Sequence, residues 1–312
     1  MLASIVEDFA RVEDCEVVTT LDERLIDRSL PARDVVRTRG DDAPTFRQLA
    51  AESDWTLVVA PEFDHILFDR TRWVEECGGR LLGPTSLSVS ITADKLTCER
   101  QLREAAVPTP QSLCVSLEEL RVRRRRDFHV SYVLKPRDGA GSQCIFLVRD
   151  RETLIDVIDT WTTENGPATA LVQPFVPGLA VSIALLVGPT ETTPLVPARQ
   201  ILSDDGRLRY LGGELPLPLE LAERARHLGL RACGAIPGLR GYVGVDLVLG
   251  DRNADDVVIE INPRLTTSYV GLRAYCRANL AALMIACVSG STLPPIRWQR
   301  GRICFRADGS LA

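Results

Sequence analysis

The stretch of sequence that most constrains the fold is residues 241–268, GYVGVDLVLGDRNADDVVIEINPRLTTS. Two apolar runs rich in β-branched residues lie on either side of a polar, turn-forming segment at 250–253, and this pattern predicts a β-hairpin. Inside those runs stand Asp246, Glu260 and Asn262. Glu260 and Asn262 are two positions apart and share one face of their strand, and an antiparallel partner can place Asp246 on the same face.

These three side chains predict a metal site. Two crowded carboxylates repel each other unless a cation lies between them. Oxygen ligands alone, with an amide among them, suit Mg²⁺ or Mn²⁺ rather than Zn²⁺, and Mg²⁺ held by few protein groups usually also binds substrate phosphates. The alternative is that residues 260–263 merely end a strand on its solvated face.

Composition limits the class of protein. With 312 residues, 45% of them hydrophobic and 25% charged, the chain can bury a substantial core in two or three lobes. A net charge of −5 gives no general attraction for nucleic acid, no apolar run approaches the ~18 residues of a membrane span, and residues 1–10 do not resemble a signal peptide.

Cysteine and histidine usage narrows the class further. The nine cysteines are scattered singly without a CxxC pair, which argues against a zinc site and a disulfide framework and predicts a reducing, cytoplasmic location. Three histidines and no Gly-x-Ser-x-Gly motif leave little material for a hydrolase triad.

The N-terminal region alternates helices and strands, which predicts a small parallel-sheet domain over residues 1–90. Helices are expected at 2–12, 46–51 and 69–77, and strands at 16–21 and 55–60. Because the chain opens on a helix, an earlier strand is expected to be missing. Parallel sheets bind ligands beyond the carboxyl ends of their strands, where Glu62 and Asp64 would lie. A solvated loop is favoured for Asp64, whereas both readings stay open for Glu62.

Two lysines occupy positions that suit anion binding. Lys95 lies in the first turn of a helix expected at 94–105, where its charge opposes the helix dipole unless it meets an anion; a plain surface lysine is the alternative. Lys135 ends an apolar strand at 131–136, where a charge is costly without an anionic partner. The residues that follow, Gly139, Gly141 and Ser142, let backbone N–H groups approach phosphate oxygens.

Two other segments complete the pattern. In residues 171–178, LVQPFVPG, the prolines lack N–H groups, but the carbonyl of Pro174 can accept from an adenine amino group while Val176 keeps its N–H as a donor. The arginine-rich run at 121–126 is interpreted as a solvated helix end or loop rather than a nucleic acid site.

Taken together, residues 90–273 resemble the ATP-grasp superfamily. The resemblance is carried by the helix start at Asp94, the strand that ends at Lys135 with its glycine loop, the hinge at 173–178 and the metal pattern from Asp246 to 260–264. The segment EINPRLTTSYVGL at 260–272 is similar to the subgroup that contains the tyramine–glutamate ligases.

The resemblance implies an α/β chain, α+β in its ATP-grasp lobes. Three domains are expected: an N-terminal pre-ATP-grasp domain at 1–90, a small ATP-grasp subdomain at 91–172 and a large one at 173–312. It implies that ATP phosphates bind Lys95, Lys135 and the Gly139–Gly141–Ser142 loop, and that adenine faces Gln173, Pro174 and Val176. It further implies that Mg²⁺ (or Mn²⁺) binds Asp246, Glu260 and Asn262.

The implied activity is an ATP-dependent carboxylate–amine ligase. A carboxylate, by resemblance glutamate, becomes an acyl phosphate with release of ADP, and a tyramine-like amine then attacks to give an amide. The family usually has an acidic residue for the ribose two positions after the hinge glycine, where this chain has Ala180. A nucleotide-binding module without turnover and a kinase therefore stay open, as does a homodimer.

Arg264 and Lys135 are the expected catalytic residues. Arg264 directly follows the metal pattern, so its guanidinium should enter the same cavity and hold a phosphoryl or carboxylate group. A long helix is expected at 269–287, with Thr267 or Ser268 as its cap and its positive dipole end aimed at the site. The alternative is a structural pair between Arg264 and a carboxylate such as Glu260.

Overall fold

The computed structural model describes residues 1–25, 29–122, 131–139, 144–164 and 168–312 of the chain. Within these ranges the strands form three separate sheets. The mixture of a parallel N-terminal sheet with antiparallel sheets further along the chain confirms the predicted combination of α/β and α+β structure.

The N-terminal part of the chain holds a two-stranded parallel sheet with helices around it. β1 (Val18–Asp22) pairs in parallel with β2 (Asp34–Thr38), so a parallel sheet is present as predicted, but its second strand is not among those expected. The helical elements in this part are α1 (Leu2–Ala10), α2 (Ala43–Glu52), the single turn η1 (Phe63–His65) and α3 (Ile66–Glu76).

The strand predicted at residues 55–60 is wrong. This segment makes a single parallel bridge, from Thr56 to Leu81, and no ladder. Val58 and Ala60 instead lie in a small core with Leu67 and residues of the neighbouring helices. The other apolar side chains, of Trp55, Leu57 and Val59, pack against a second, larger core. An apolar run indicates a buried segment, and this segment is buried by packing rather than by pairing with other strands.

Two helices connect the N-terminal part to the rest of the molecule. α4 (Ser86–Ala93) and α5 (Lys95–Glu104) are separated by Asp94 alone. The Asp94 carboxylate accepts hydrogen bonds from the backbone N–H groups of Leu96 and Thr97, at 3.0 and 3.1 Å. This N-cap starts α5 at Lys95 and so fixes that lysine in the first turn of the helix.

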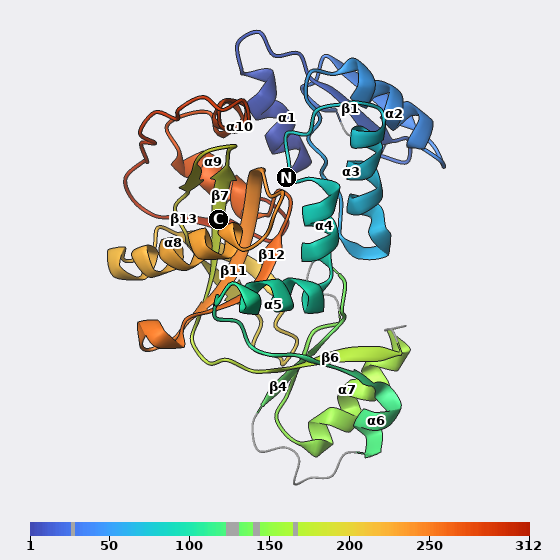
Figure 1. Cartoon of the computed structure of the whole chain (residues 1–312), viewed down its shortest axis with the longest axis vertical. Helices are drawn as coiled ribbons and strands as arrows, with labels where there is room; N and C mark the ends of the chain where they lie inside the picture. Colours follow the sequence, from blue (N-terminus) through green and yellow to red (C-terminus); the bar gives the residue numbers. More distant parts are fainter. Residues whose placement is uncertain (26–28, 123–130, 140–143, 165–167) are drawn as a thin grey trace.

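The second sheet is antiparallel, with strand order β3-β6-β4-β5. It forms one end of the molecule, with β4, β6, α6 and α7 together in Figure 1. Its buried core contains Trp161 and Phe146. The elements of this small lobe are β3 (Leu113–Ser116), α6 (Leu117–Val122), β4 (Tyr132–Lys135), β5 (Phe146–Val148), α7 (Arg151–Thr163) and β6 (Thr169–Pro174).

The third sheet is the largest and contains the predicted hairpin. Its strand order is β12-β11-β7-β9-β10-β13, with β8 paired to β7, and all its pairs are antiparallel. A short turn, η3 (Asn253–Asp255), joins the hairpin strands. The strands are β7 (Leu179–Val187), β8 (Thr192–Pro194), β9 (Ala198–Leu202), β10 (Tyr210–Leu215), β11 (Gly241–Leu249), β12 (Val257–Asn262) and β13 (Ile303–Arg306).

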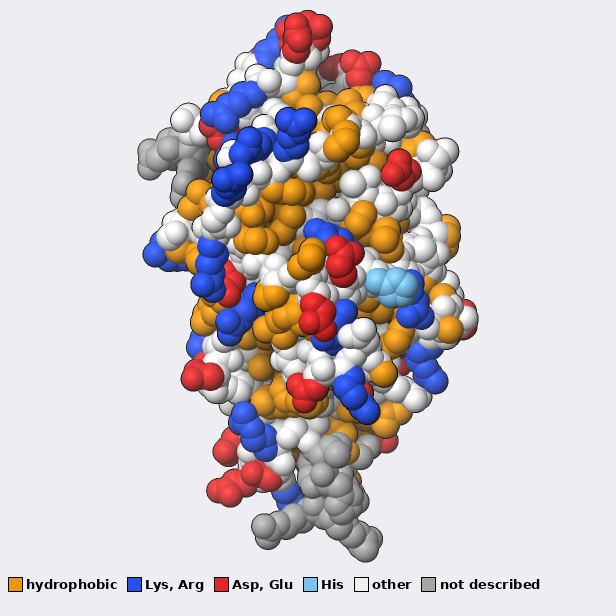
Figure 2. Space-filling model, turned by 90° about the vertical axis from the view of Figure 1, so that its left-hand side faces the viewer, with side chains coloured by type: hydrophobic (Ala, Val, Ile, Leu, Met, Phe, Trp, Pro, Cys, Tyr) orange, Lys and Arg blue, Asp and Glu red, His pale blue; other side chains and the backbone are white. Residues whose placement is uncertain are grey.

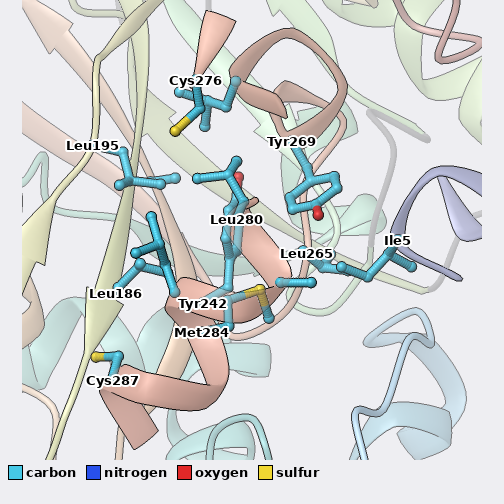
Figure 3. Close-up of a cluster of buried hydrophobic side chains, with 14 of the residues drawn as sticks. Ile5, Leu186, Leu195, Tyr242, Leu265, Tyr269, Cys276, Leu280, Met284 and Cys287 are labelled. Carbon is cyan, nitrogen blue, oxygen red and sulfur yellow. The ribbon is translucent and has the colours of Figure 1, made fainter. Parts of the chain in front are cut away.

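Both faces of this large sheet are buried. Alternate residues of β7 enter different cores: Ile183 and Leu185 lie with residues of α8 (Leu219–Gly234), whereas Ala184 and Leu186 lie with residues of α9 (Ser268–Tyr275) and α10 (Leu280–Val288). Figure 3 shows part of the second core, including Leu186, Tyr242, Tyr269 and Met284. Burial on both faces explains the continuous apolar run of β7.

The single long helix predicted at residues 269–287 is also wrong, because the chain forms α9 and α10 instead. Between them, Cys276 makes an isolated antiparallel bridge to Trp298. The Asn279 side chain accepts from the backbone N–H of Ala281 at 2.9 Å and donates to the carbonyl of Asp8 at 2.7 Å. Asn279 therefore caps a new helix at a position where apolar periodicity alone indicates no break.

The molecular surface carries charges of both signs. On the face shown in Figure 2, basic and acidic side chains are interspersed among hydrophobic ones. Among the described residues, no helix combines the length and apolar character that crossing a bilayer requires.

Candidate active site

The hairpin brings the predicted metal ligands together. Asp246 on β11 lies opposite Glu260 on β12, next to an irregularity in the register of the two strands. The Asn262 amide donates to one Asp246 oxygen at 3.1 Å, and the Gln200 amide on β9 donates to the other at 2.9 Å. The hairpin and the clustering of these side chains on it are thus as predicted.

The electrostatics of this pair favour a cation. Burial, together with the charge of Glu260, raises the pKa of Asp246 to about 7. Burial alone would raise the pKa of Glu260 too, but the nearby charges of Lys95 and Lys135 outweigh it and lower that pKa. Two carboxylates that repel each other in a partly dry site are the environment in which a cation is most strongly favoured.

The donor set fits a hard divalent cation. Among the described residues, no group of three or more His, Cys, Asp or Glu side chains could hold a metal ion. A cation at the hairpin would therefore rest on the carboxylates of Asp246 and Glu260 and on the amide oxygen of Asn262, whose nitrogen already donates to Asp246. Oxygen ligands of this kind suit Mg²⁺ or Mn²⁺.

Both predicted phosphate lysines lie next to the hairpin. The Lys95 ammonium donates to the carbonyl of Gly139 at 3.2 Å and lies 3.9 Å from a carboxylate oxygen of Glu260. Lys135 ends β4, and its buried ammonium donates to the Gln173 side-chain oxygen at 2.9 Å. Burial lowers the pKa of Lys135 to about 8. The lysines thus bring positive charge from α5 and from the small lobe to one place.

Gln173 has a different contact from the one expected. Its side-chain oxygen accepts from Lys135, and its nitrogen donates to the Ser112 hydroxyl at 3.0 Å and to the Pro110 carbonyl at 3.3 Å. The amide therefore holds Lys135, and Gln173 also lines the cavity described below. Adenine contacts stay a prediction for Gln173, the Pro174 carbonyl and the Val176 N–H.

A cavity of about 360 Å³ is lined by Lys135, Gln173 and the hairpin carboxylates, whereas Lys95 lies outside its walls. This volume lies within the range of pockets that take small molecules. Its walls come from the small lobe, the hinge and the large sheet, and they include the Pro174 and Val176 positions. The polar part is lined by Lys135, Asp246, Glu260, Asn262 and Arg264, and the apolar part by Val133, Ile145, Leu202, Leu208 and Val248.

Arg264 lines the same cavity but pairs with a residue from the N-terminal part of the chain. Its Nε donates to Glu62 Oε1 at 2.8 Å, and its Nη1 donates to the Leu265 carbonyl at 3.1 Å. The expected alternative partner, Glu260, is therefore the wrong carboxylate. Burial raises the pKa of Glu62, although the Arg264 charge opposes this shift.

Comparisons with known proteins decide the family. The ATP-grasp domain model matches residues 92–268, and the pre ATP-grasp 3 domain model matches residues 15–89. The chain belongs to the ATP-grasp family. The boundaries predicted for three domains, at 90 and 172, stay a prediction.

Three known proteins are similar to this ATP-grasp chain. It is 30% identical over 232 residues to the tyramine–L-glutamate ligase of Methanocaldococcus fervens, a match that covers 74% of the chain and 65% of that relative's length. A protein from Archaeoglobus fulgidus assigned to the ATP-grasp superfamily is 27% identical, with a TM-score of 0.65 over 91% of this chain and 77% of that one.

The third relative shows the shared fold alone. The biotin carboxylase domain of the 2-oxoglutarate carboxylase of Hydrogenobacter thermophilus was solved with magnesium ADP and bicarbonate. It is 17% identical to the ATP-grasp chain, with a TM-score of 0.77 over 96% of this chain and 70% of that one. At this identity only the arrangement of the backbone is comparable.

The departure at Ala180 is visible in the ATP-grasp cavity. Ala180 lines the cavity on β7, where it offers no acceptor for a ribose hydroxyl. Ser182, two positions after Ala180 on the same strand, lies opposite Asp246 in the register of β7 and β11, and its side chain hydrogen-bonds that carboxylate. Ser182 is therefore part of the carboxylate cluster rather than a replacement for the acidic residue.

The loop after Arg264 is organised by hydroxyl groups rather than by a side-chain cap. Thr267 is the N-cap residue of α9, but its side chain makes no cap hydrogen bond. Ser268 does not cap the helix either, because its hydroxyl lies 2.7 Å from that of Thr266 and 3.2 Å from that of Tyr242. The first turn of α9 thus begins beside the cavity, which is lined by 266–268.

Sequence reasoning missed two residues of the ATP-grasp site. Gln200 and Tyr210 come from β9 and β10, strands for which no expectation was made, and both line the cavity. Gln200 follows Arg199 in the run 198–202, ARQIL, and no pattern in this run singles it out. Of the predicted loop residues, Gly141 and Ser142 lie outside the described residues, as does most of the arginine run at 121–126.

Proposed function

We propose that this ATP-grasp chain is an ATP-dependent carboxylate–amine ligase. The observation that supports this most is the pair of facing carboxylates, Asp246 and Glu260, which share one cavity with Lys135 and Arg264. Lys95 lies 3.9 Å from the Glu260 carboxylate. Alternating anionic and cationic groups of this kind can hold a metal-bound polyphosphate and a second anion side by side. The chain spans less than two thirds of the ligase it matches, so the whole activity is a proposal.

Each group has a proposed role in binding ATP. Lys95 and Lys135 neutralise the nucleotide phosphates, with the loop that contains Gly139, Gly141 and Ser142 closing over them. Pro174 and Val176 hold adenine through backbone groups against the apolar walls of the cavity. Asp246, Glu260 and Asn262 would hold Mg²⁺ or Mn²⁺, which supplies positive charge that weakens the bond between the β- and γ-phosphates when it is bound.

The proposed chemistry has two steps. A carboxylate oxygen of the substrate attacks the γ-phosphorus of ATP, ADP leaves and an acyl phosphate forms. The amine nitrogen then attacks the acyl carbon, phosphate leaves, and the nitrogen loses a proton to give the amide. Arg264 and Lys135 stabilise charge on the transferring phosphoryl group, and the N-terminus of α9 adds its dipole.

The substrates follow from the relative rather than from the cavity. We propose glutamate as the carboxylate and a tyramine-like aromatic amine as the acceptor, since the relative at 30% identity is named for these compounds. A cytoplasmic location fits an enzyme that consumes ATP. The homodimer stays a prediction.

The test is ADP release from ATP measured over pairs of amino acids and amines, with glutamate and tyramine as the first pair. A ligase requires both partners for full turnover. A kinase would release ADP without any amine, and a module that only binds nucleotide, the outcome that Ala180 favours, would bind ATP without releasing ADP. Omitting the divalent cation is the control, because it should abolish ADP release without unfolding the protein.

A further inference from the structure

We propose that Glu62 is a positioning residue for Arg264, and that through it the N-terminal part of the chain completes the ligase site. The inference rests on the proposed function, because orienting Arg264 affects catalysis only if a charged group reacts in the cavity. Glu62 is not expected to touch the substrate, and it acts through the arginine.

The contact is long-range and nearly dry. The two residues are 202 positions apart, and the side chains of Arg264 and Glu62 are 16% and 5% exposed. Glu62 fixes Nε from one side, while the Leu265 carbonyl fixes Nη1. These two hydrogen bonds use two of the five N–H groups of the guanidinium. Because the guanidinium is planar, they also fix the orientation of the remaining N–H groups, and the Arg264 side chain lines the cavity.

The Glu62 carboxylate makes fewer hydrogen bonds than we expect for an ion pair with a purely structural role. Glu62 is buried, and among the described residues its Oε2 atom has no hydrogen-bond partner. A buried acceptor without a partner destabilises the fold, and an apolar pair of similar size would avoid the cost. The ion pair is therefore better explained by what it does for Arg264 than by its contribution to stability.

The backbone beside Glu62 adds a second, independent observation. Asp64 and His65 follow one another in the left-handed region, at φ 52° and 57°, although neither is glycine. A non-glycine residue adopts this region at a conformational cost. The Leu67 N–H closes the loop on the Pro61 carbonyl at 2.9 Å. Strained backbone of this kind concentrates where a side chain must be held in one place, and here that side chain is Glu62.

Another ion pair in the same molecule shows what structural anchoring looks like. Arg273 donates to both oxygens of Asp8, at 2.8 and 2.6 Å, and the Tyr269 hydroxyl also donates to Asp8 at 2.6 Å. This cluster joins α1 to α9, it leaves neither carboxylate oxygen without a partner, and it does not line the cavity that contains Arg264. Asp8 is therefore the matched control for Glu62.

The first test separates catalysis from binding. We expect Glu62→Gln and Glu62→Ala to lower kcat by about tenfold or more while the Kd for Mg·ATP stays within about threefold of the parent. Formate added to Glu62→Ala should restore part of the lost rate by replacing the carboxylate. Asp8→Asn should lower the Tm but keep kcat within about twofold. Equal loss of kcat in Asp8→Asn and Glu62→Ala would overturn the proposal.

The loop can be tested without changing Glu62. His65→Gly allows the left-handed backbone and should keep the parent kcat, whereas His65→Val disfavours that backbone and should lose kcat as Glu62→Gln does. The His65 side chain is exposed, so a difference in kcat between these variants reflects the backbone conformation rather than a lost side-chain contact. Equal kcat in both variants would contradict a positioning role for the loop.

A measurement without turnover distinguishes this inference from the proposed function. In ¹⁵N-labelled protein, the Nε–H signal of Arg264, assigned by its loss in Arg264→Lys, should be protected from solvent exchange and should shift when Mg·ADP is added. It should lose protection in Glu62→Ala and keep it in Asp8→Asn. If this holds but the parent forms no amide with any pair tested, the ligase proposal fails and the positioning stands. Unchanged protection in Glu62→Ala overturns the positioning.

Discussion

Asp246 on β11 and Glu260 on β12 face each other directly across the hairpin, with Lys95 3.9 Å from the Glu260 carboxylate. The mutual repulsion of the two carboxylates is visible in the raised pKa of Asp246, which burial and the charge of Glu260 produce together. The proposed cation between the two carboxylates would relieve this repulsion.

The first prediction removes one charge from this pair. Glu260→Gln should lower Mg²⁺-dependent ADP formation by about 100-fold or more, because it removes one ligand charge at nearly constant volume. Thermal unfolding should show an intact fold, since the repulsion with Asp246 is relieved. Asn262→Ala should behave alike. Asp255→Asn, on the exposed turn of the same hairpin, is the control, and unchanged ADP formation in Glu260→Gln would sink the metal assignment.

The second prediction concerns pH and Lys135, whose pKa is lowered by burial from 10.5 to about 8. Below about pH 8 the lysine is charged without nucleotide, and above it the lysine is neutral. Bound phosphates favour the charged form, so Mg·ATP affinity should fall as pH rises through 8. The stability of the protein without nucleotide has the opposite pH dependence. Burying the charged lysine lowers the free energy of unfolding below pH 8, and this penalty is relieved as pH rises from 8 toward 10.5.

Calorimetry in buffers of different ionisation enthalpy tests this linkage. Between about pH 8 and 10, binding of Mg·ATP should take up a proton, and the uptake should disappear near pH 6.5, where Lys135 is already protonated. Lys135→Met should bind more weakly and show less proton uptake at pH 8.5. The same uptake in Lys135→Met as in the parent would show that another group titrates.

The third prediction restores the acidic residue that the family usually has. Ala180→Glu places a carboxylate in the cavity wall, and if the ribose hydroxyls lie within reach it should tighten Mg·ATP binding by roughly tenfold, as expected for a hydrogen bond to a charged group. Ala180→Gln, whose side chain has the same shape as glutamate but no charge, should tighten Mg·ATP binding less. Titrations that show no change or weaker binding in Ala180→Glu would mean that the hinge is wrongly aligned.

The fourth prediction tests the break between α9 and α10. Asn279→Ala should lower the free energy of unfolding by about 1 kcal/mol, because it removes the N-cap of α10. It also removes a hydrogen bond to the Asp8 carbonyl. Asn279→Asp keeps the capping oxygen and should recover part of the loss. A variant as stable as the parent in chemical denaturation would show that neither contact matters.

Much of the site could be predicted because its determinants are local. Asp246, Glu260 and Asn262 stand on two adjacent strands joined by a short turn, so the period of a β-strand is sufficient to bring them together. Lys135 could be predicted for the same reason, since a charge at the end of an apolar strand requires a partner. Lys95 depends on the helix that starts at Asp94, a signal contained in a few residues.

What sequence could not supply depends on distant contacts. The partner of Arg264 is Glu62, and no pattern links residues 202 positions apart without a homologue alignment. The helix break at Asn279 depends on α1, through the Asp8 carbonyl. The segment 55–60 has the composition of a strand. Its tertiary contacts decide otherwise, because Val58 and Ala60 pack against helices and the segment makes a single bridge instead of a ladder.

The central claim is that ATP activates a carboxylate as an acyl phosphate in the cavity that Arg264 lines. Trapping with hydroxylamine tests it most directly, with glutamate as the first carboxylate and each other amino acid after it. The parent given ATP and its carboxylate should yield a hydroxamate and an equal amount of ADP. Arg264→Ala should bind Mg·ATP within about fivefold of the parent yet form little hydroxamate. Release of AMP and pyrophosphate by the parent, or hydroxamate formed by Arg264→Ala at the parent rate, would contradict this account.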